Sequence, residues 1–322
     1  VGGESIFVHR NTSRYHLIET LSKIKDQAGN HPVITAMSLS ENPDFKAIKA
    51  SGFQEYHAER LAVTRARYGG RTKVAERIQE ARQLGVYEPQ FHGKEHLNIK
   101  AWMRCLQQPA AYPNTALAFE HGISGLHPWM AKEDRIDFQA AFHISNKEEL
   151  PFLRQVLKQG IEGFEQEYQL APIYFVPPNG PYHNALDDDL KNLGIQYLCA
   201  PKNRQQPEGE GQYSRHFHYL GQQLDNGITM ITRNVVFEPA IVSDQEQLIE
   251  NTLADIASAY FFRKPVIISS HRVNYVGGIN PANRQKGFAS LAELLRRALE
   301  RWPDITFMSS SQLGQYINHS RA

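Results

Sequence analysis

Cysteine is scarce in this chain, and neither sign of charge dominates it. Only Cys105 and Cys199 occur in 322 residues. This count excludes a disulfide-stapled secreted scaffold, and the helical and strand patterns around the two residues favour buried free thiols. The 35 Lys and Arg residues and 34 Asp and Glu residues leave a net charge of +1. Because no basic excess is present to collect phosphates, we expect no nucleic-acid partner.

Long apolar runs and nucleotide motifs are also missing. No apolar run reaches the roughly eighteen residues that a membrane-spanning helix needs, so no membrane span is expected. No G-x-G-x-x-G follows a strand pattern and no Walker A sequence occurs, so a nucleotide site has no local support. No signal peptide is visible, which slightly favours the cytoplasm. The chain opens on Val1 and not on Met, so the N-terminus need not be complete.

Short apolar runs alternate with helical periodicities along most of the chain. Hydrophobic residues make up 41% of the sequence, enough to fill a core. The apolar runs predict strands at 32–37, 173–176, 195–199, 229–237, 265–270 and 305–308. Helical spacing predicts helices at 17–24, 74–81, 99–106, 146–168, 185–193, 243–260 and 288–302, the 243–260 helix opening on a capping box of Ser243 and Glu246.

This alternation predicts a parallel sheet covered by helices on both faces. About six or seven such units favour a barrel over an open sheet, and chemistry in a barrel lies at the C-terminal ends of the strands. We therefore expect a single α/β barrel domain over residues 1–322. Its irregular insertions would lie near 109–140, where turn formers interrupt any period, and near 201–215, a polar and Gly-rich stretch that is typical of a surface loop. The oligomeric state is not determined by these patterns.

His92 and His96 form an H-x-x-x-H pair directly after one strand pattern. Two imidazoles four residues apart lie on one side of a helical turn, close enough to share one metal ion. Pro89 and Gly93 allow the chain to turn sharply at this point. With fourteen histidines in the chain, two unrelated loop histidines are the competing interpretation.

Three further strand ends carry polar residues. His271 follows the apolar run 265–270 and is followed by Arg272, Asn274 and Tyr275. A histidine in this place is able to give a proton to a leaving group at neutral pH. The alternative is a structural histidine whose ring only forms a hydrogen bond within the turn. At 175–182 three prolines and a glycine make an irregular rim that bears Asn179 and Tyr182, with a rigid turn as the alternative. Arg233 ends another strand, where it and Glu238 could equally form a structural ion pair.

Three of these segments resemble the motifs of one enzyme family. His92-Gly93-Lys94-Glu95-His96 is similar to the H-(S/T)-x-x-H metal motif of the polysaccharide deacetylase superfamily, the NodB-homology domain. The segment Val176-Pro177-Pro178-Asn179-Gly180 looks like its R-P-P-Y-G motif, and Ser270-His271 looks like its L-x-H motif. The three occur in the family's order, and the resemblance covers roughly residues 30 to 318, as a divergent member.

The resemblance implies a distorted (β/α)7 barrel that holds one divalent ion, most often zinc. By it, His92 and His96 would be metal ligands and His271 the general acid. A metal-bound water would attack the acetyl carbonyl of a carbohydrate, with N-acetyl preferred, and acetate would leave. The substrate would be contacted by the polar strand-end residues Asn179, Tyr182, Arg233, Arg272, Asn274 and Tyr275.

The chain departs from the family pattern in two places. The T-F-D-D motif of the first strand, which supplies a metal-binding Asp and the catalytic base, is not found, and the simplest explanation is that this strand lies upstream of Val1. Glu95 could be a spectator or could stand in for part of this carboxylate chemistry, and we count it among the catalytic candidates. Val176 stands where the family has an Arg that orients the catalytic base, and Arg233 or Arg272 could take over that role.

Two rival interpretations remain. His92-x-x-Glu95-His96 also matches the H-x-x-E-H pattern of inverted zinc peptidases, which requires a long helix around the motif. The other rival is a carbohydrate-binding barrel that has lost catalysis and binds sugar through aromatic residues such as Tyr182, Tyr275 and Trp129. Metal content and acetate release would separate these from a deacetylase.

Overall fold

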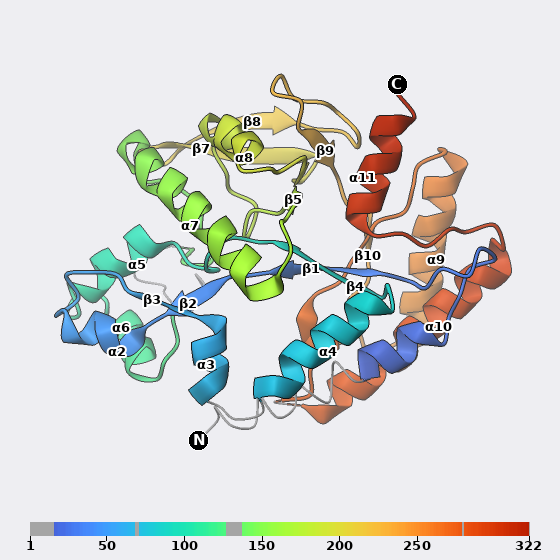
Figure 1. Cartoon of the computed structure of the whole chain (residues 1–322), viewed down its shortest axis with the longest axis horizontal. Coiled ribbons are helices and arrows are strands. Elements are labelled where there is room, and N and C mark those ends of the chain that lie inside the picture. The colour runs from blue at the N-terminus through green and yellow to red at the C-terminus, as the bar shows by residue number, and fades with distance from the viewer. Residues whose placement is uncertain (1–15, 68–70, 127–136, 279, 322) are drawn as a thin grey trace. The chain divides into compact units, whose positions relative to one another are not determined.

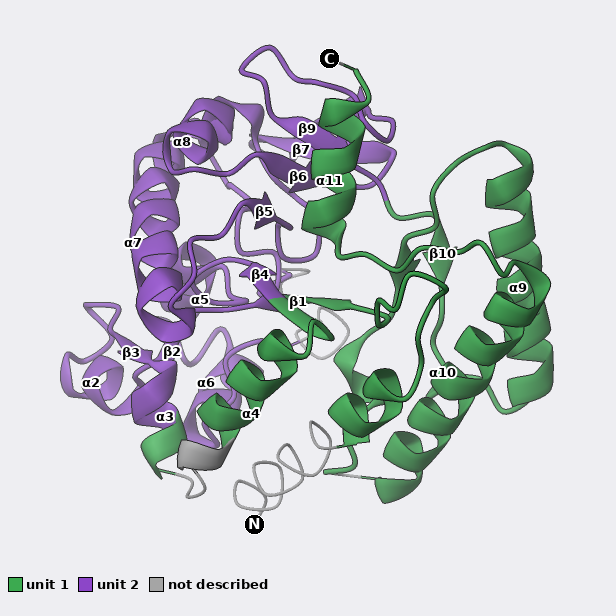
Figure 2. Cartoon of the chain, turned by 45° about the vertical axis from the view of Figure 1, so that its right-hand side comes forward, with its two compact units in different colours: residues 1–36, 65–88, 233–322 green, residues 37–64, 89–232 purple. Residues whose placement is uncertain are grey.

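The computed structural model describes residues 16–67, 71–126, 137–278 and 280–321. The chain forms two compact units, which are coloured separately in Figure 2. Unit 1 comprises residues 1–36, 65–88 and 233–322, and unit 2 comprises residues 37–64 and 89–232. Trp129, one of the aromatic residues considered for sugar binding, lies outside the described residues.

A five-stranded sheet runs in chain order (Figure 1). Its order is β1 (Ile34–Ser38), β4 (Tyr87–Phe91), β5 (Tyr174–Phe175), β6 (Tyr197–Cys199) and β9 (Thr229–Ile231). The pairs β4–β5, β5–β6 and β6–β9 are parallel. The expected parallel α/β sheet is therefore present. The described strands do not close into a barrel, because β10 (Val235–Val236) and β11 (Ile268–Ser269) form a separate parallel pair.

Unit 2 is built around the apolar side of helix α7 (Leu150–Tyr168). Leu153, Leu157, Ile161 and Phe164 recur at helical spacing and are buried, so one stripe of the helix packs into a core that also contains Phe175. The other described elements in or entering this unit are β2 (Glu41–Pro43), α2 (Phe45–Ala50), β3 (Ala58–Arg60), α3 (Leu61–Arg67), α5 (Ile99–Leu106), α6 (Pro113–Glu120), η1 (Lys147–Glu149), η2 (Asn184–Leu186), α8 (Asp187–Asn192), β7 (Asn203–Gly209) and β8 (Gln212–Phe217).

Unit 1 has its own core. Leu253 on α9 (Gln245–Phe261) and Leu294 on α10 (Pro281–Arg301) are fully buried there with Phe237 and Val235. Its other described elements are the helical residues 16–22, α4 (Arg71–Gln83), η3 (Arg272–Asn274) and α11 (Ser310–His319). No helix in the described parts of the chain is both long and apolar enough to cross a membrane.

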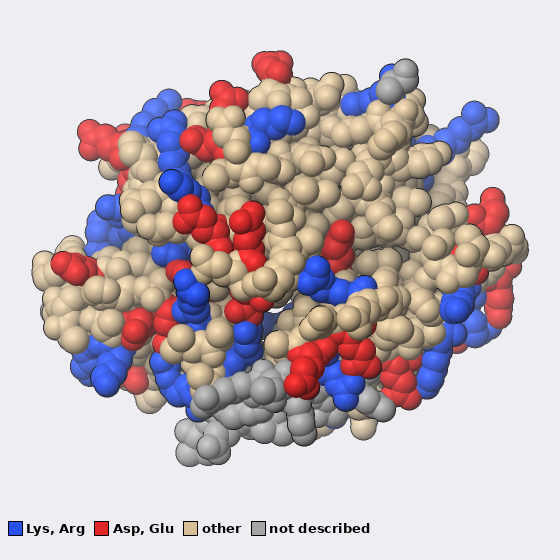
Figure 3. All heavy atoms as spheres, viewed as in Figure 1, with Lys and Arg blue, Asp and Glu red and all other residues tan. Residues whose placement is uncertain are grey.

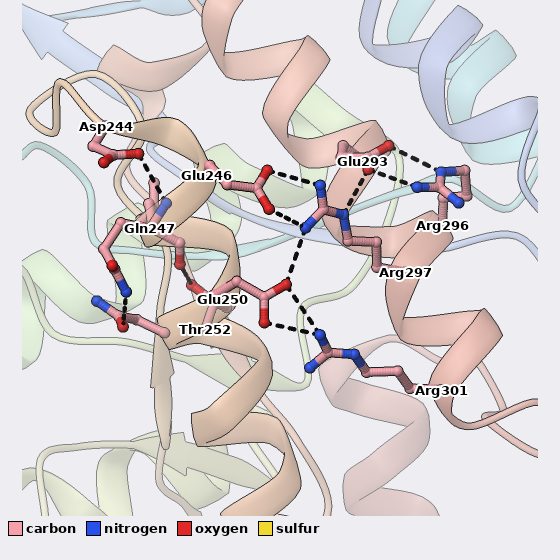
Figure 4. A network of polar contacts seen from close by, with 11 residues as sticks. Asp244, Glu246, Gln247, Glu250, Thr252, Glu293, Arg296, Arg297 and Arg301 are labelled. Carbon is pink, nitrogen blue, oxygen red and sulfur yellow. Dashed lines mark hydrogen bonds and ion pairs between the residues drawn. The ribbon is translucent and has the colours of Figure 1, made fainter.

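An ion-pair network joins α9 to α10 on the surface of unit 1 (Figure 4). Arg297 binds both carboxylate oxygens of Glu246, at 2.5 and 2.7 Å, and also contacts Glu250 and Glu293. Arg301 contacts both oxygens of Glu250 through one nitrogen, Nη2. The fork-to-fork contact of Arg297 with Glu246 fixes the orientation of both side chains, unlike a single-atom contact. Elsewhere, acidic and basic side chains are interspersed on the face shown in Figure 3.

Three sequence expectations about loops and strands are wrong. Residues 201–215 are not a loop but most of the β7–β8 hairpin, which turns through three consecutive left-handed residues at 209–211. The segment 109–140 contains the helix α6. Residues 305–308 form no strand, because the backbone N–H of Phe307 donates to the Asp26 carboxylate, at 2.9 Å, and not to a neighbouring strand.

Two local expectations have opposite outcomes. Ser243 and Glu246 do not form a capping box, since Asp244 caps α9 by accepting from the Gln247 N–H at 2.9 Å. Cys105 and Cys199 are both buried and are not disulfide-bonded, as the sequence predicted.

Candidate functional site

In unit 2, His92 and His96 lie at the C-terminal end of β4, and their rings meet. The ring centroids are 5.0 Å apart and the planes cross at 71°, and both side chains are half-buried. The Nδ1 atom of His92 lies 2.6 Å from the Val176 carbonyl oxygen. Since a carbonyl only accepts, Nδ1 carries the proton and the lone pair of His92 is on Nε2.

The segment between the two histidines is irregular and not helical. Residues 92–98 have no helical structure before α5 begins at Ile99. Gly93 has φ +104°, a conformation that L side chains rarely adopt, and a Cβ there would meet Pro178 at 3.4 Å. The expected helical turn is therefore wrong, although the rings still come together. The H-x-x-E-H peptidase interpretation loses its basis with it, because that mechanism needs both histidines on one helix.

Glu95 is buried and lies in a polar cluster with Tyr56, Lys94, Glu41 and Gln159. Its Oε1 accepts from the Tyr56 hydroxyl at 2.7 Å, and Lys94 Nζ is 3.8 Å from the same oxygen. Lys94 Nζ also contacts Glu41, at 3.2 Å, and Gln159, at 3.1 Å. Burial raises the pKa of Glu95 to about 7, against the opposing effects of the Lys94 charge and the Tyr56 hydrogen bond.

The described residues supply two imidazoles for a metal but not a full set of ligands. Within the described ranges, no group of three or more His, Cys, Asp or Glu residues is arranged to hold an ion. Protein zinc sites use three or four such ligands. Glu95, His92 and His96 do not form such a group. The predicted metal site is therefore incomplete on the residues that the structure describes.

In unit 1, His271 and Glu238 form a close pair at the end of β11. His271 Nδ1 lies 2.6 Å from Glu238 Oε1, which also accepts the backbone N–H of His271 at 3.1 Å. The carboxylate is largely buried, with 12% of its side chain exposed, whereas 78% of the His271 side chain is exposed. A carboxylate on Nδ1 fixes the ring and its tautomer, so Nε2 is presented outward. The pair therefore presents an oriented, exposed imidazole nitrogen.

Asn274 forms hydrogen bonds to both members of this pair. It is fully buried, and its Nδ2 donates to Glu238 Oε2 at 2.7 Å and to the His271 carbonyl at 2.8 Å, while its Oδ1 accepts from the Ala240 N–H at 2.8 Å. The sequence predicted that Asn274 contacts the substrate. Because its side chain has no exposed surface, this prediction is wrong. Asn274 positions the carboxylate that positions His271.

Tyr275 and Arg233 brace the same strand ends. The Tyr275 hydroxyl lies 2.9 Å from Ser270 Oγ, and burial raises the pKa of Tyr275 to about 12. Arg233 donates to Ser269 Oγ at 3.0 Å. The proposed ion pair between Arg233 and Glu238 is wrong, because Glu238 binds His271. Arg272, beside His271, is exposed.

The rim segment of unit 2 divides into an exposed and a buried part. Asn179 is exposed, has φ +53°, and donates through Nδ2 to Asp137 Oδ2 at 2.9 Å. Tyr182 is 0% exposed and packs against Phe142 and Phe175 in the core. Its ring therefore has no surface to offer a ligand, contrary to the sequence prediction.

Glu238 is the residue that sequence reasoning missed as a partner of His271. Val235 pairs with Ile268 and Val236 with Ser269 in the parallel β10–β11 ladder. Glu238 and His271 each follow two residues after the last pair, so the register brings them opposite one another. The sequence does show a carboxylate after one apolar run and a histidine after another. It does not show that these two runs pair as neighbouring strands.

Comparisons with known proteins give only distant structural likenesses. No protein-family model matches the sequence, and no curated protein matches it. Among solved structures, the chain is similar to a "putative polysaccharide deacetylase" from Mycobacterium smegmatis, with 14% identity and a TM-score of 0.42 over 81% of this chain and 70% of that one. It is also similar to the alpha-amylase AmyC from Thermotoga maritima, with 9% identity and a TM-score of 0.41 over 78% of this chain and 52% of that one.

Proposed function

We propose that this protein is a carbohydrate deacetylase, a hydrolase that removes an acetyl group, preferably N-linked, from a sugar or polysaccharide. The observation that carries the proposal is the exposed His271 imidazole held by the buried carboxylate of Glu238. The motif resemblance at His92–His96, at Asn179 and at His271 supplies the reaction class. The fold likeness is too distant to add to it.

His271 would act as the proton donor. Water adds to the acetyl carbonyl carbon, the bond from that carbon to the sugar nitrogen breaks, and the charged His271 ring delivers the proton that the leaving nitrogen needs from Nε2. The proton released by the attacking water then restores the charged ring. Glu238 keeps the ring in one tautomer and stabilises its charged form. Proton transfer of this kind contributes about 10²- to 10⁴-fold to a rate.

We further propose that His92 and His96 bind a divalent metal, with zinc preferred. The Val176 carbonyl on Nδ1 orients the His92 ring as partners of ligating histidines do, leaving the lone pair on Nε2 for an ion. A bound ion would supply positive charge that polarises the acetyl carbonyl, although two imidazoles alone do not complete its site.

Acetate release from N-acetylated oligosaccharides and O-acetylated sugars tests the proposal. We expect His271→Ala to lower kcat at least about 10²-fold, and Glu238→Gln to lower kcat with little change in KM. His319→Ala, at an exposed histidine at the end of α11, is the matched control and should leave the rate unchanged. No acetate from any acetylated carbohydrate, or full activity in His271→Ala, would overturn the proposal.

Metal analysis provides a separate test. Elemental analysis of zinc-loaded protein should find one zinc per chain, lost in His92→Ala and His96→Ala but retained in His319→Ala. Equal zinc content in all four proteins would remove the two histidines from the proposed metal site.

A carbohydrate-binding protein without catalysis is the second candidate. The incomplete ligand set favours it. It predicts that sugar affinity is independent of metal and that no acetate is released, whereas the deacetylase requires acetate release.

A further inference from the structure

The β7–β8 hairpin, which Figure 1 labels, buries polar side chains and exposes aromatic ones, the reverse of an ordinary surface hairpin. The inward-facing residues Arg204 and Gln206 are polar and buried, at 3% exposure each. Arg204 donates to the Tyr182 carbonyl at 2.8 Å, and the Gln206 amide oxygen accepts from the Asn184 N–H at 3.0 Å. Polar contacts therefore anchor the hairpin to its unit.

The outward face carries aromatic side chains. Tyr213 and Phe217 alternate with Arg215 along β8, so all three point to the same side. The residues Tyr213, Phe217 and the adjacent Tyr219 are 48%, 66% and 56% exposed. Buried polar side chains and exposed apolar patches both depart from the usual pattern of burial. An exposed patch of aromatic side chains is a common feature of binding surfaces.

The strand register places amide and guanidinium groups among these rings. Asn203 lies opposite Phe217, and Gln205 lies opposite Arg215. All four of these side chains are exposed. Tyr213 and Phe217 are separated by roughly 14 Å along the strand, so they are able to contact different units of one chain molecule but not one small ligand.

The charge on this face indicates the chemistry of the ligand. The outward-facing members of the hairpin, Asn203, Gln205, Tyr213, Arg215 and Phe217, include no carboxylate. Among the described residues, Arg215 has no acidic partner within ion-pair distance. Its guanidinium therefore complements an electron-rich oxygen, such as the carbonyl of an acetamido group or a sugar carboxylate.

We propose that this hairpin face, composed of Asn203, Gln205, Tyr213, Arg215, Phe217 and Tyr219, is an accessory binding surface for a polysaccharide chain. The aromatic rings would stack on the apolar C–H faces of separate sugar units, and Arg215 and Gln205 would donate hydrogen bonds to the oxygens between them. The choice of a sugar chain as ligand rests on the proposed deacetylase function. The ring of Tyr213 is already oriented, since its hydroxyl lies 2.8 Å from His143 Nε2, which lowers the cost of ordering it on binding.

Binding to insoluble chitin and to soluble N-acetylated oligosaccharides of increasing length tests this surface without requiring catalysis. We expect the double variant Tyr213→Ala/Phe217→Ala to bind long chains at least about 10-fold more weakly, since aromatic anchors carry a large share of the binding energy at such surfaces. Tyr213→Phe keeps the ring and should retain binding. Tyr316→Ala, at a 66% exposed tyrosine of α11, is the matched control and should bind like the wild type.

The two proposals fail in different ways. If polysaccharide binding depends on Tyr213 and Phe217 but the protein releases no acetate, the deacetylase proposal is overturned and the binding surface is supported. If the protein releases acetate but the double variant binds polysaccharide like the wild type, the binding surface is overturned and the deacetylase proposal is supported. Dimers in sedimentation that dissociate in the double variant would assign the face to a second copy, and binding to single-stranded RNA in place of polysaccharide would likewise overturn the proposal.

Discussion

Gly287 allows helix α10 to contact the segment that carries His271. A Cβ built at this glycine would lie 1.8 Å from the carbonyl oxygen of Asn274 and 2.8 Å from its carbonyl carbon. Ordinary van der Waals contact begins at 3.4 Å, so Gly287→Ala requires a displacement of about 1.6 Å, well beyond ordinary side-chain adjustment. The obstructing atoms are backbone, which cannot rotate away as the end of a flexible side chain does.

Two effects oppose each other in this variant. Alanine is better than glycine in a helix interior by about 1 kcal/mol. Overpacking costs about 1–3 kcal/mol and more where the backbone must shift. Because the overlap is severe, we expect the clash to exceed the gain and a net destabilisation of about 2 kcal/mol. This corresponds to roughly 4–8 °C in the Tm of a unit of this size.

The loss of function should exceed the loss of stability. Moving Asn274 breaks its contacts to Glu238 and to the His271 carbonyl, and a misplacement of about 1 Å in a catalytic group costs about 10²-fold in rate. We expect acetate release to fall by that order at temperatures where Gly287→Ala is fully folded. Thermal unfolding, followed by circular dichroism, and the rate below the transition are the measurements.

Gly163→Ala is the matched control on another helix. A Cβ at Gly163 would approach the Ser40 side chain at 3.2 Å, which needs only a few tenths of an ångström of movement. We expect it to be neutral or slightly stabilising. A Gly287→Ala protein with the Tm and the rate of the wild type would refute the reasoning, since it would mean that η3 and α10 are not in fixed contact.

Three further changes have clear expected outcomes. Gly160→Ala places a Cβ 2.9 Å from the Phe91 ring and should lower both the Tm and the zinc affinity, measured by calorimetric titration. Burial raises the pKa of Asp187 to about 6, so the native state keeps this proton to higher pH than the unfolded state does. The free energy of unfolding should fall between about pH 4 and pH 6, by at most about 3 kcal/mol, and urea titrations of Asp187→Asn should lack this slope. Arg297→Lys keeps the charge but loses the two-point contact with Glu246, so its Tm should be lower at low salt and approach that of the wild type at 1 M salt, where exposed charges are screened.

The helices could be predicted because their periodicity is local. The buried stripe of α7, from Leu153 to Phe164, repeats at helical spacing within one continuous segment, and tertiary contacts only had to agree with it. The short buried strand β6 was equally visible, since Tyr197–Cys199 is buried throughout.

The predictions that failed depended on partners distant in sequence. The run Ile305–Met308 has strand composition, but its backbone is bound by the Asp26 side chain, 281 residues away along the chain from Phe307. The expected strand 229–237 is divided into β9 and β10. The Asn234 side chain between them accepts from the Ile267 N–H at 2.8 Å and donates to the Pro265 carbonyl at 2.8 Å. No local pattern contains these contacts.

The site residues illustrate the same distinction between residue type and residue pairing. His271 was identifiable because a titratable ring follows an apolar run, whereas its dependence on Glu238 follows from the β10–β11 register. A register shifted by one residue would bring Pro239 or Phe237 opposite His271, and neither side chain is able to accept the Nδ1 proton. Asn274 reinforces the observed register, because it binds Ala240 after β10 and His271 after β11. In the proposed deacetylase, the proton transfer by His271 would therefore depend on two strand ends held in register by one buried amide, and substitutions at Asn274 should lower acetate release without any contact with substrate.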